Sequence, residues 1–170
     1  MRFTLIDRIV ELKTGEEITA VKNLSLAEEY LADHFPLFPV LPGVLMLEAM
    51  TQASAWLIRH DEDFANSIVV LKEARNIKYA NFVEPGSTLM VNAKQLKQDE
   101  RTTTFKTQGT VDGNVHVSAR LILERYNLAD TNPEDAPLDE RAKNDLRLLF
   151  QRLYRPLKES HSSEASGTGP

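Results

Sequence analysis

A histidine and a glutamate, His34 and Glu48, lie fourteen residues apart in the stretch HFPLFPVLPGVLMLEAMTQ, residues 34–52. An imidazole can accept a proton near neutral pH, and a carboxyl group can donate one, so the pair could perform general acid–base chemistry. Taken alone, the histidine reads as a loop residue with a satisfied hydrogen bond. The glutamate lies in an apolar run, where an ionised carboxylate needs a partner, and Arg59 or Gln52 could supply it.

The residues between the pair strengthen the catalytic reading. Pro42 suits the first turn of a helix, and good helix formers follow, so the sequence predicts a helix over residues 43–60 that is buried nearly all round. The first N–H groups of a helix have no partner within it, and those of Gly43 and Val44 can bind negative charge that develops on an oxygen. Proton transfer and oxyanion binding are therefore predicted together.

Most of the remaining sequence up to residue 126 has β-strand patterning. Strand-like runs lie at 67–71, 76–80, 88–96, 102–111 and 115–124, after an opening strand, turn and strand around Gly15, and residues 26–32 have helical composition. Asp112 and Gly113 predict a tight hairpin between the last two runs. One long buried helix with five or six largely antiparallel strands predicts an α+β domain whose sheet curls around the helix.

The composition changes beyond Tyr126. A polar, acidic linker leads to an amphipathic helix predicted at about 138–155, and a low-complexity tail is predicted to be disordered after about 158. The apolar stripe of that helix consists of Leu146, Leu149, Phe150 and Leu153. Because a short isolated helix is marginal in water, we expect the stripe to dock on its own sheet or on a neighbouring subunit. The sequence thus predicts a domain over 1–126 and an extension over 127–170.

Composition excludes several classes of protein. A net charge of −5 argues against a general nucleic-acid binder, and the lack of cysteine rules out disulfides, a thiolate nucleophile and cysteine-ligated zinc. No nucleotide-binding, α/β-hydrolase or zincin motif is present, so neither metal nor cofactor is expected. The apolar run 44–58 is broken by Glu48 and Gln52 and is too short to span a bilayer. We predict a cytoplasmic protein, because no signal peptide is visible.

The stretch 34–52 resembles the active-site segment of the FabZ-type 3-hydroxyacyl-[acyl carrier protein] dehydratases, which have the hot-dog fold. Their pattern is H-F-P-x-x-P-x-x-P-G-V-L-x-x-E-A-x-x-Q, and every fixed position is filled here. Glutamate rather than aspartate at position 48 favours the FabZ type over the FabA type. The segments KYANFVEPGSTL at 78–89 and VDG at 111–113 look like further family segments, so the resemblance covers about residues 1–126.

This resemblance implies dehydration of (3R)-3-hydroxyacyl thioesters on acyl carrier protein, in fatty-acid or related lipid or polyketide biosynthesis. It implies a homodimer, or a trimer of such dimers, in which His34 of one chain is the base and Glu48 of the other protonates the departing hydroxyl. Gly43 and Val44 would hold the thioester oxygen. The substrate tunnel would be lined by Phe35, Met46, Met50, Gln52, Tyr79 and Phe82, and the carrier protein would dock on Lys72, Arg75 and Lys78.

The sequence departs from the family pattern at two places, and two alternative functions stay open. Asp33 replaces the glycine that usually precedes the histidine, which bears on the loop conformation and on the basicity of His34. The family's basic docking run is thinned here to Lys78, with two cations upstream. A hot-dog thioesterase would use Glu48 to activate water and would release a free thiol. A non-catalytic scaffold member would dock a partner through the C-terminal helix.

Overall fold

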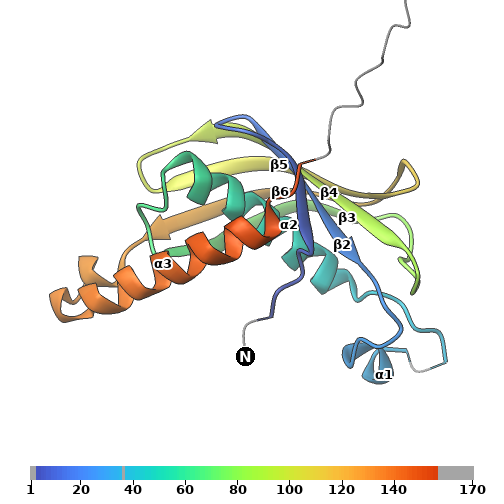
Figure 1. The fold of residues 1–170 in the computed structure, drawn as a ribbon. Helices are drawn as coiled ribbons and strands as arrows, with labels where there is room; N and C mark the ends of the chain where they lie inside the picture. The colour runs from blue at the N-terminus through green and yellow to red at the C-terminus, as the bar shows by residue number, and fades with distance from the viewer. Residues whose placement is uncertain (1–2, 36, 157–170) are drawn as a thin grey trace, which may run out of the picture.

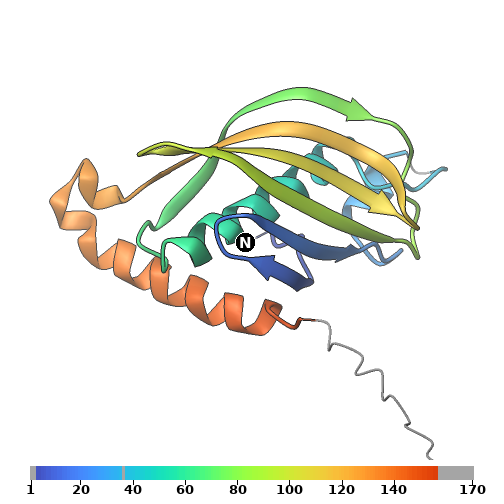
Figure 2. The same ribbon diagram turned by 90° about the horizontal axis from the view of Figure 1, so that it is seen from above.

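The computed structural model describes residues 3–35 and 37–156, and six antiparallel strands form one sheet in the order β1-β2-β4-β5-β6-β3. The strands are β1 Arg8–Lys13, β2 Glu17–Asn23, β3 Ile68–Tyr79, β4 Thr88–Gln98, β5 Thr102–Val111 and β6 Asn114–Tyr126. Helix α2, Gly43–Asp61, lies along one face of the curved sheet (Figures 1 and 2). The predicted α+β architecture is therefore confirmed.

Helix α2 is the centre of the hydrophobic core. Ala49, Ala53 and Leu57 are fully buried, and the helix packs against every strand from β2 to β6. Side chains from the inner face of the sheet, such as Phe105 and Leu121, are also fully buried and belong to the same core cluster. The prediction of a long helix wrapped by protein is correct, because its apolar residues occupy most of the helical circumference.

The β5–β6 hairpin forms where the sequence predicts it. Asp112 and Gly113 have φ angles of 49° and 80°. A tight turn that matches the twist of the flanking strands needs positive φ at both central residues, and Asp-Gly accepts this with little strain. Local turn chemistry thus fixes the register between β5 and β6.

Strand β3 differs from its prediction. The runs 67–71 and 76–80 are not two strands but parts of one, Ile68–Tyr79, which pairs with β6 along its length with two irregularities of register. Asn76, between the runs, has a φ angle of 52°. The strand lies at the edge of the sheet and is largely exposed, so its charged middle lacks the apolar alternation that marks a half-buried strand.

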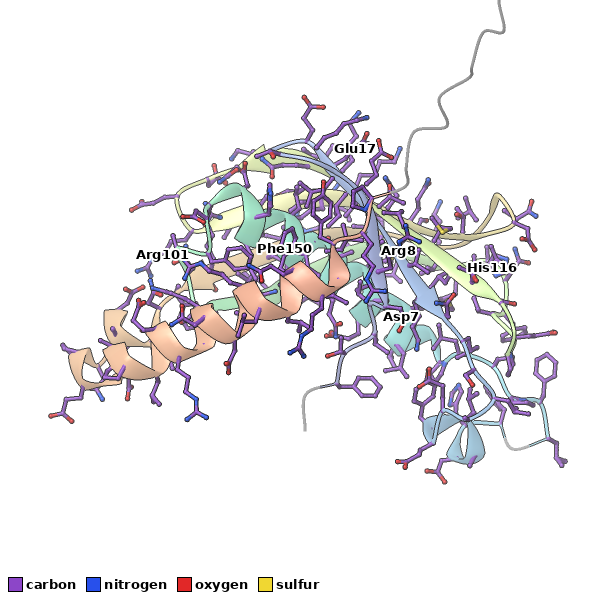
Figure 3. The ribbon with its side chains drawn as sticks, in the orientation of Figure 1. Asp7, Arg8, Glu17, Arg101, His116 and Phe150 are labelled. Atoms are coloured by element: carbon purple, nitrogen blue, oxygen red, sulfur yellow. The ribbon has the colours of Figure 1, made fainter. Side chains whose placement is uncertain are left out.

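Helix α3, Ala136–Leu153, follows two 3-10 turns, η1 Leu128–Asp130 and η2 Pro133–Asp135. The stripe predicted on it faces the C-terminal half of α2: Phe150 is buried, with its ring centroid 6.0 Å from that of Trp56 and 5.7 Å from that of Phe64. Figure 3 shows Phe150 on the side of α3 that is turned toward α2. Beyond the helix, the N–H of Arg155 donates to the carbonyl of Ile9 in β1.

A buried carboxylate fixes the start of this extension. Asp139 is 2% exposed and accepts hydrogen bonds from the N–H groups of Leu128 and Ala129, both at 2.9 Å, and from the hydroxyl of Ser67. Burial opposes ionisation of Asp139, but the hydroxyl and the two N–H groups outweigh it and lower the pKa of the carboxyl. The ionised side chain of Asp139 thereby connects the linker, through hydrogen bonds, to the loop that precedes β3.

Three predictions about the C-terminal part of the chain remain to be compared with the structure. The amphipathic helix predicted at about 138–155 corresponds to α3, whereas the predicted disordered tail lies outside the described residues. The division into a domain over 1–126 and an extension over 127–170 stays a prediction. No helix among the described residues is long and apolar enough to cross a membrane.

Candidate active site

The loop that carries His34 is held at both ends. Helix α1, Tyr30–Asp33, is shorter than the helical run predicted at 26–32, and the N–H of His34 closes it by donating to the carbonyl of Tyr30 at 3.2 Å. Further on, the N–H of Leu41 donates to the carbonyl of Val83 at 2.9 Å. The prolines at 39 and 42 keep the segment between them from becoming helical.

Phe35, directly after the histidine, adopts an uncommon backbone conformation. Its φ angle is 51°, in the left-handed region that bulky side chains rarely occupy. Its carbonyl accepts a hydrogen bond from the N–H of Phe38 at 2.8 Å, and its ring lies 4.4 Å from that of His34. Backbone strain of this kind gathers at functional sites, where the surrounding structure maintains it.

His34 opens onto a cavity of about 430 Å³ between this loop, the start of α2 and the end of β3. Residues of the predicted site that line it are His34, Phe35, Gly43, Met46, Tyr79 and Phe82. The lining is mainly apolar, with one imidazole and a few polar groups, as is usual for sites that bind small organic molecules. The structure therefore brings together six of the residues that the sequence singled out.

The helix start at this cavity has unpaired N–H groups. The carbonyl of Pro42 accepts from Leu45 at 2.9 Å and from Met46 at 3.1 Å, whereas the N–H groups of Gly43 and Val44 have no acceptor within the described part of the chain. Gly43 packs against the ring of Tyr79 so closely that a Cβ would lie 3.0 Å from Cε1. Glycine thus lets the aromatic wall approach the helix start, where an oxygen could bind.

Glu48 lies elsewhere on α2. Successive helical residues are rotated by about 100°, so Glu48 is about 200° from Met46 and projects from the opposite side of the helix. Its Oε1 accepts a hydrogen bond from Nε2 of Gln52 at 2.9 Å. Of the two partners considered from the sequence, Gln52 is the one present and Arg59 makes no such contact. Glu48 is therefore not among the residues that line the cavity of His34 in the same chain.

The other predicted tunnel residues, Gln52 and Met50, also lie away from the cavity. Gln52 donates to the carbonyl of Phe3 at 2.8 Å and accepts from the N–H of Leu5 at 2.9 Å, so it anchors the N-terminal segment. Met50 is fully buried in the core. Their place in a substrate tunnel stays a prediction.

The predicted docking residues all lie on β3. Lys72 pairs with Glu124 at 2.9 Å and Arg75 pairs with Glu73 at 2.6 Å, which leaves less of their charge for a partner. Lys78 is exposed and makes no salt bridge within residues 3–35 and 37–156. The structure thus separates one unpaired cation from two paired ones.

One contact was missed from the sequence. His116 in β6 is within hydrogen-bonding distance of the Phe82 carbonyl through Nδ1, at 2.9 Å, and its own carbonyl accepts from Ala80 at 2.8 Å. His116 thereby holds residues 80–82, which form one wall of the cavity. The only signal in the sequence was that His116 alternates onto the polar side of its strand. Among the described residues, no group of three or more acidic, histidine or cysteine side chains could hold a metal ion.

Comparisons with known proteins agree with this fold. The FabA-like domain model matches residues 1–120. The 3-hydroxyacyl-[acyl-carrier-protein] dehydratase FabZ of Lactococcus lactis subsp. cremoris is 35% identical over 119 residues, which cover 70% of this chain and 82% of the relative. The dehydratase heterocomplex ApeI:P from Xenorhabdus doucetiae matches with a TM-score of 0.62 at 22% identity, over 78% of this chain and 90% of that chain. A Pseudomonas aeruginosa thioesterase matches with a TM-score of 0.56 at 17% identity, over 70% and 80% of the respective chains.

The two structural matches show the fold alone: a hot-dog domain, in which a curved antiparallel sheet wraps a central helix. Among hot-dog proteins, this chain belongs to the FabA-like family and, within it, to the relatives named FabZ.

Proposed function

We propose that the protein dehydrates (3R)-3-hydroxyacyl thioesters carried on acyl carrier protein to trans-2-enoyl thioesters, in fatty-acid or related lipid or polyketide biosynthesis. The observation that carries the proposal is the apolar cavity in which His34 meets the open helix start at Gly43. The family's named relatives are 3-hydroxyacyl-[acyl-carrier-protein] dehydratases, which supports the same substrate class. A cytoplasmic location, predicted from the sequence, belongs to this proposal.

The reaction divides between three groups. The imidazole of His34 removes the α-proton, and the electron pair of that C–H bond becomes the new Cα–Cβ double bond. The N–H groups of Gly43 and Val44 stabilise the charge that develops on the thioester oxygen. The β-carbon–oxygen bond breaks, and Glu48 of the partner subunit donates a proton so that the hydroxyl departs as water.

A second subunit fits this division of roles. Glu48 projects from the side of α2 opposite the cavity-lining Met46, so His34 needs a carboxyl group from elsewhere. Strand β3 is twelve residues long, borders the cavity at Tyr79, and has one edge with no partner among the described residues. Val70 and Ile77 are exposed on it. A long uncovered edge favours pairing with another strand, here β3 of a second copy. A homodimer is the smallest active unit, and a trimer of dimers is the larger assembly that we keep as a prediction.

Hydration of crotonyl thioesters, the reverse reaction, tests the function. Loss of enoyl absorbance without release of free thiol is expected on crotonyl carrier protein. Free thiol with no hydration would identify a thioesterase, and neither product would favour a scaffold protein. Coenzyme A thioesters measured alongside would show whether the carrier protein is preferred.

Mixing two inactive variants tests the shared site. His34→Ala and Glu48→Gln subunits, mixed equally and allowed to exchange, should regain about a quarter of wild-type turnover, because half of the dimers are mixed and each holds one intact site. Subunit exchange is verified by mass spectrometry with differently tagged chains. If exchange is complete and turnover stays at the level of the parent variants, the two residues do not act across subunits.

A further inference from the structure

His116 occupies a β-bulge in β6. Gly109 in β5 is opposite Val117 in β6. The next residue of β5, Thr110, is opposite Val115, so His116 has no counterpart on β5. An extra residue of this kind changes the direction in which a side chain leaves the strand, and bulges are frequent beside active sites. The neighbouring strand is closely fitted here, because a Cβ on Gly109 would lie 2.8 Å from Cγ1 of Val117. The backbone of the sheet therefore sets the direction of the His116 ring.

The ring of His116 binds the chain beyond the end of strand β3. The pairing of β3 with β6 ends where Tyr79 is opposite Val117, and the chain then leaves the sheet. The carbonyl of His116 accepts from the N–H of Ala80 at 2.8 Å, and its Nδ1 lies 2.9 Å from the carbonyl oxygen of Phe82. A carbonyl can only accept, so Nδ1 carries the proton and donates. Within residues 3–35 and 37–156, no other group donates to the Phe82 carbonyl.

The segment that His116 binds also contacts the loop of His34. The ring of Phe82 lies edge-on to the ring of Phe38, with their centroids 5.6 Å apart. The N–H of Phe38 in turn donates to the carbonyl of Phe35, the residue after His34. Phe82 and the two residues before it line the cavity together with His34 and Phe35. Both rings of the Phe38–Phe82 pair are exposed, so this wall of the cavity is restrained by a few specific contacts, and the one from His116 is made directly at Phe82.

We propose that His116 is a positioning residue: its Nδ1–H group fixes the Phe82 carbonyl, and with it the wall of the cavity against which the acyl part of the substrate packs. This inference deepens the proposed function and rests on it. Among the described residues, His116 makes no hydrogen bond to His34 or to the helix start at Gly43, and His34 is held separately by the bond from its N–H to the carbonyl of Tyr30. Loss of the His116 ring therefore weakens substrate binding more than it slows proton transfer.

Three substitutions at position 116 test this role. The side-chain amide of asparagine can place an N–H donor near the position of Nδ1, whereas glutamine places its donor one bond further out, and leucine has no donor. His116→Leu and His116→Gln should raise KM for hydration of crotonyl carrier protein by about fivefold, as loss of one hydrogen bond would, and leave kcat within about twofold of wild type. His116→Asn should restore a KM within about twofold of wild type. Unfolding curves should show that all three variants are folded.

The split between KM and kcat separates positioning from a general loss of structure. A fall in kcat at unchanged KM, or equal effects of His116→Asn and His116→Gln, would overturn the proposal.

Hydrogen exchange measures the restraint on the wall without catalysis. The amides of Ala80 and of Leu41, which donates to the carbonyl of Val83, should lose protection in His116→Leu and keep it in His116→Asn. This difference would support the role of His116 in holding the wall even if the wild type hydrates no thioester, a result that would reject only the proposed function. Wild-type protection of both amides in His116→Leu would reject the role of His116.

Discussion

Turnover of the His34→Ala variant should fall by about 10²–10⁴-fold, the usual contribution of a positioned general acid or base. His34 is the one imidazole that lines the cavity among the described residues, so no neighbouring side chain of this type can replace it as a base. Glu48→Gln should cause a loss of similar size, because the amide keeps the shape of the side chain but cannot donate the proton. Hydration of crotonyl carrier protein, followed by absorbance, measures both losses.

Matched controls make these losses interpretable. Glu29→Gln makes the same carboxyl-to-amide change at an exposed position before α1 and should keep wild-type turnover. Unfolding curves should show that His34→Ala and Glu48→Gln remain folded. A folded variant that retains near wild-type turnover would remove its residue from the proposed mechanism.

The free energy of unfolding should fall by about 3–5 kcal/mol in the Phe150→Ala variant. Phe150 is 8% exposed, and its ring packs against those of Trp56 and Phe64, so truncation leaves a cavity between α3 and α2. Urea denaturation measures the change. Leu148→Ala removes an apolar side chain from the same helix at a position that is 56% exposed, and it should have little effect.

Equal effects of the two substitutions would contradict the packing of α3 on the core. Hydrogen exchange gives an independent reading of this contact. The amides of α3 should be protected in the wild type and lose protection in Phe150→Ala, whereas strands β4 and β5 should keep theirs. Loss of protection across the whole chain would instead indicate global destabilisation.

Much of this protein was predictable because the signals are local. The hairpin at Asp112 follows from the φ angles that Asp-Gly permits, and α2 follows from a long apolar stretch after Pro42. The segments 34–52 and 78–89 carry the family pattern in consecutive residues, so the class of protein and six of the cavity residues could be named from sequence alone.

Only the tertiary structure decided how distant residues meet. The continuous edge strand β3 was hidden because exposed strands lack apolar alternation. His34 and Glu48 are close in sequence, yet Glu48 projects from the side of α2 opposite the cavity that His34 lines, and this geometry supports the proposed site shared between chains. Lys106 in β5 and Arg120 in β6 come to lie opposite each other through strand register, and register depends on contacts along the whole sheet rather than on any one segment. Periodicity in the sequence indicates which face of an element is buried. Which segment covers that face depends on packing between segments far apart in the chain.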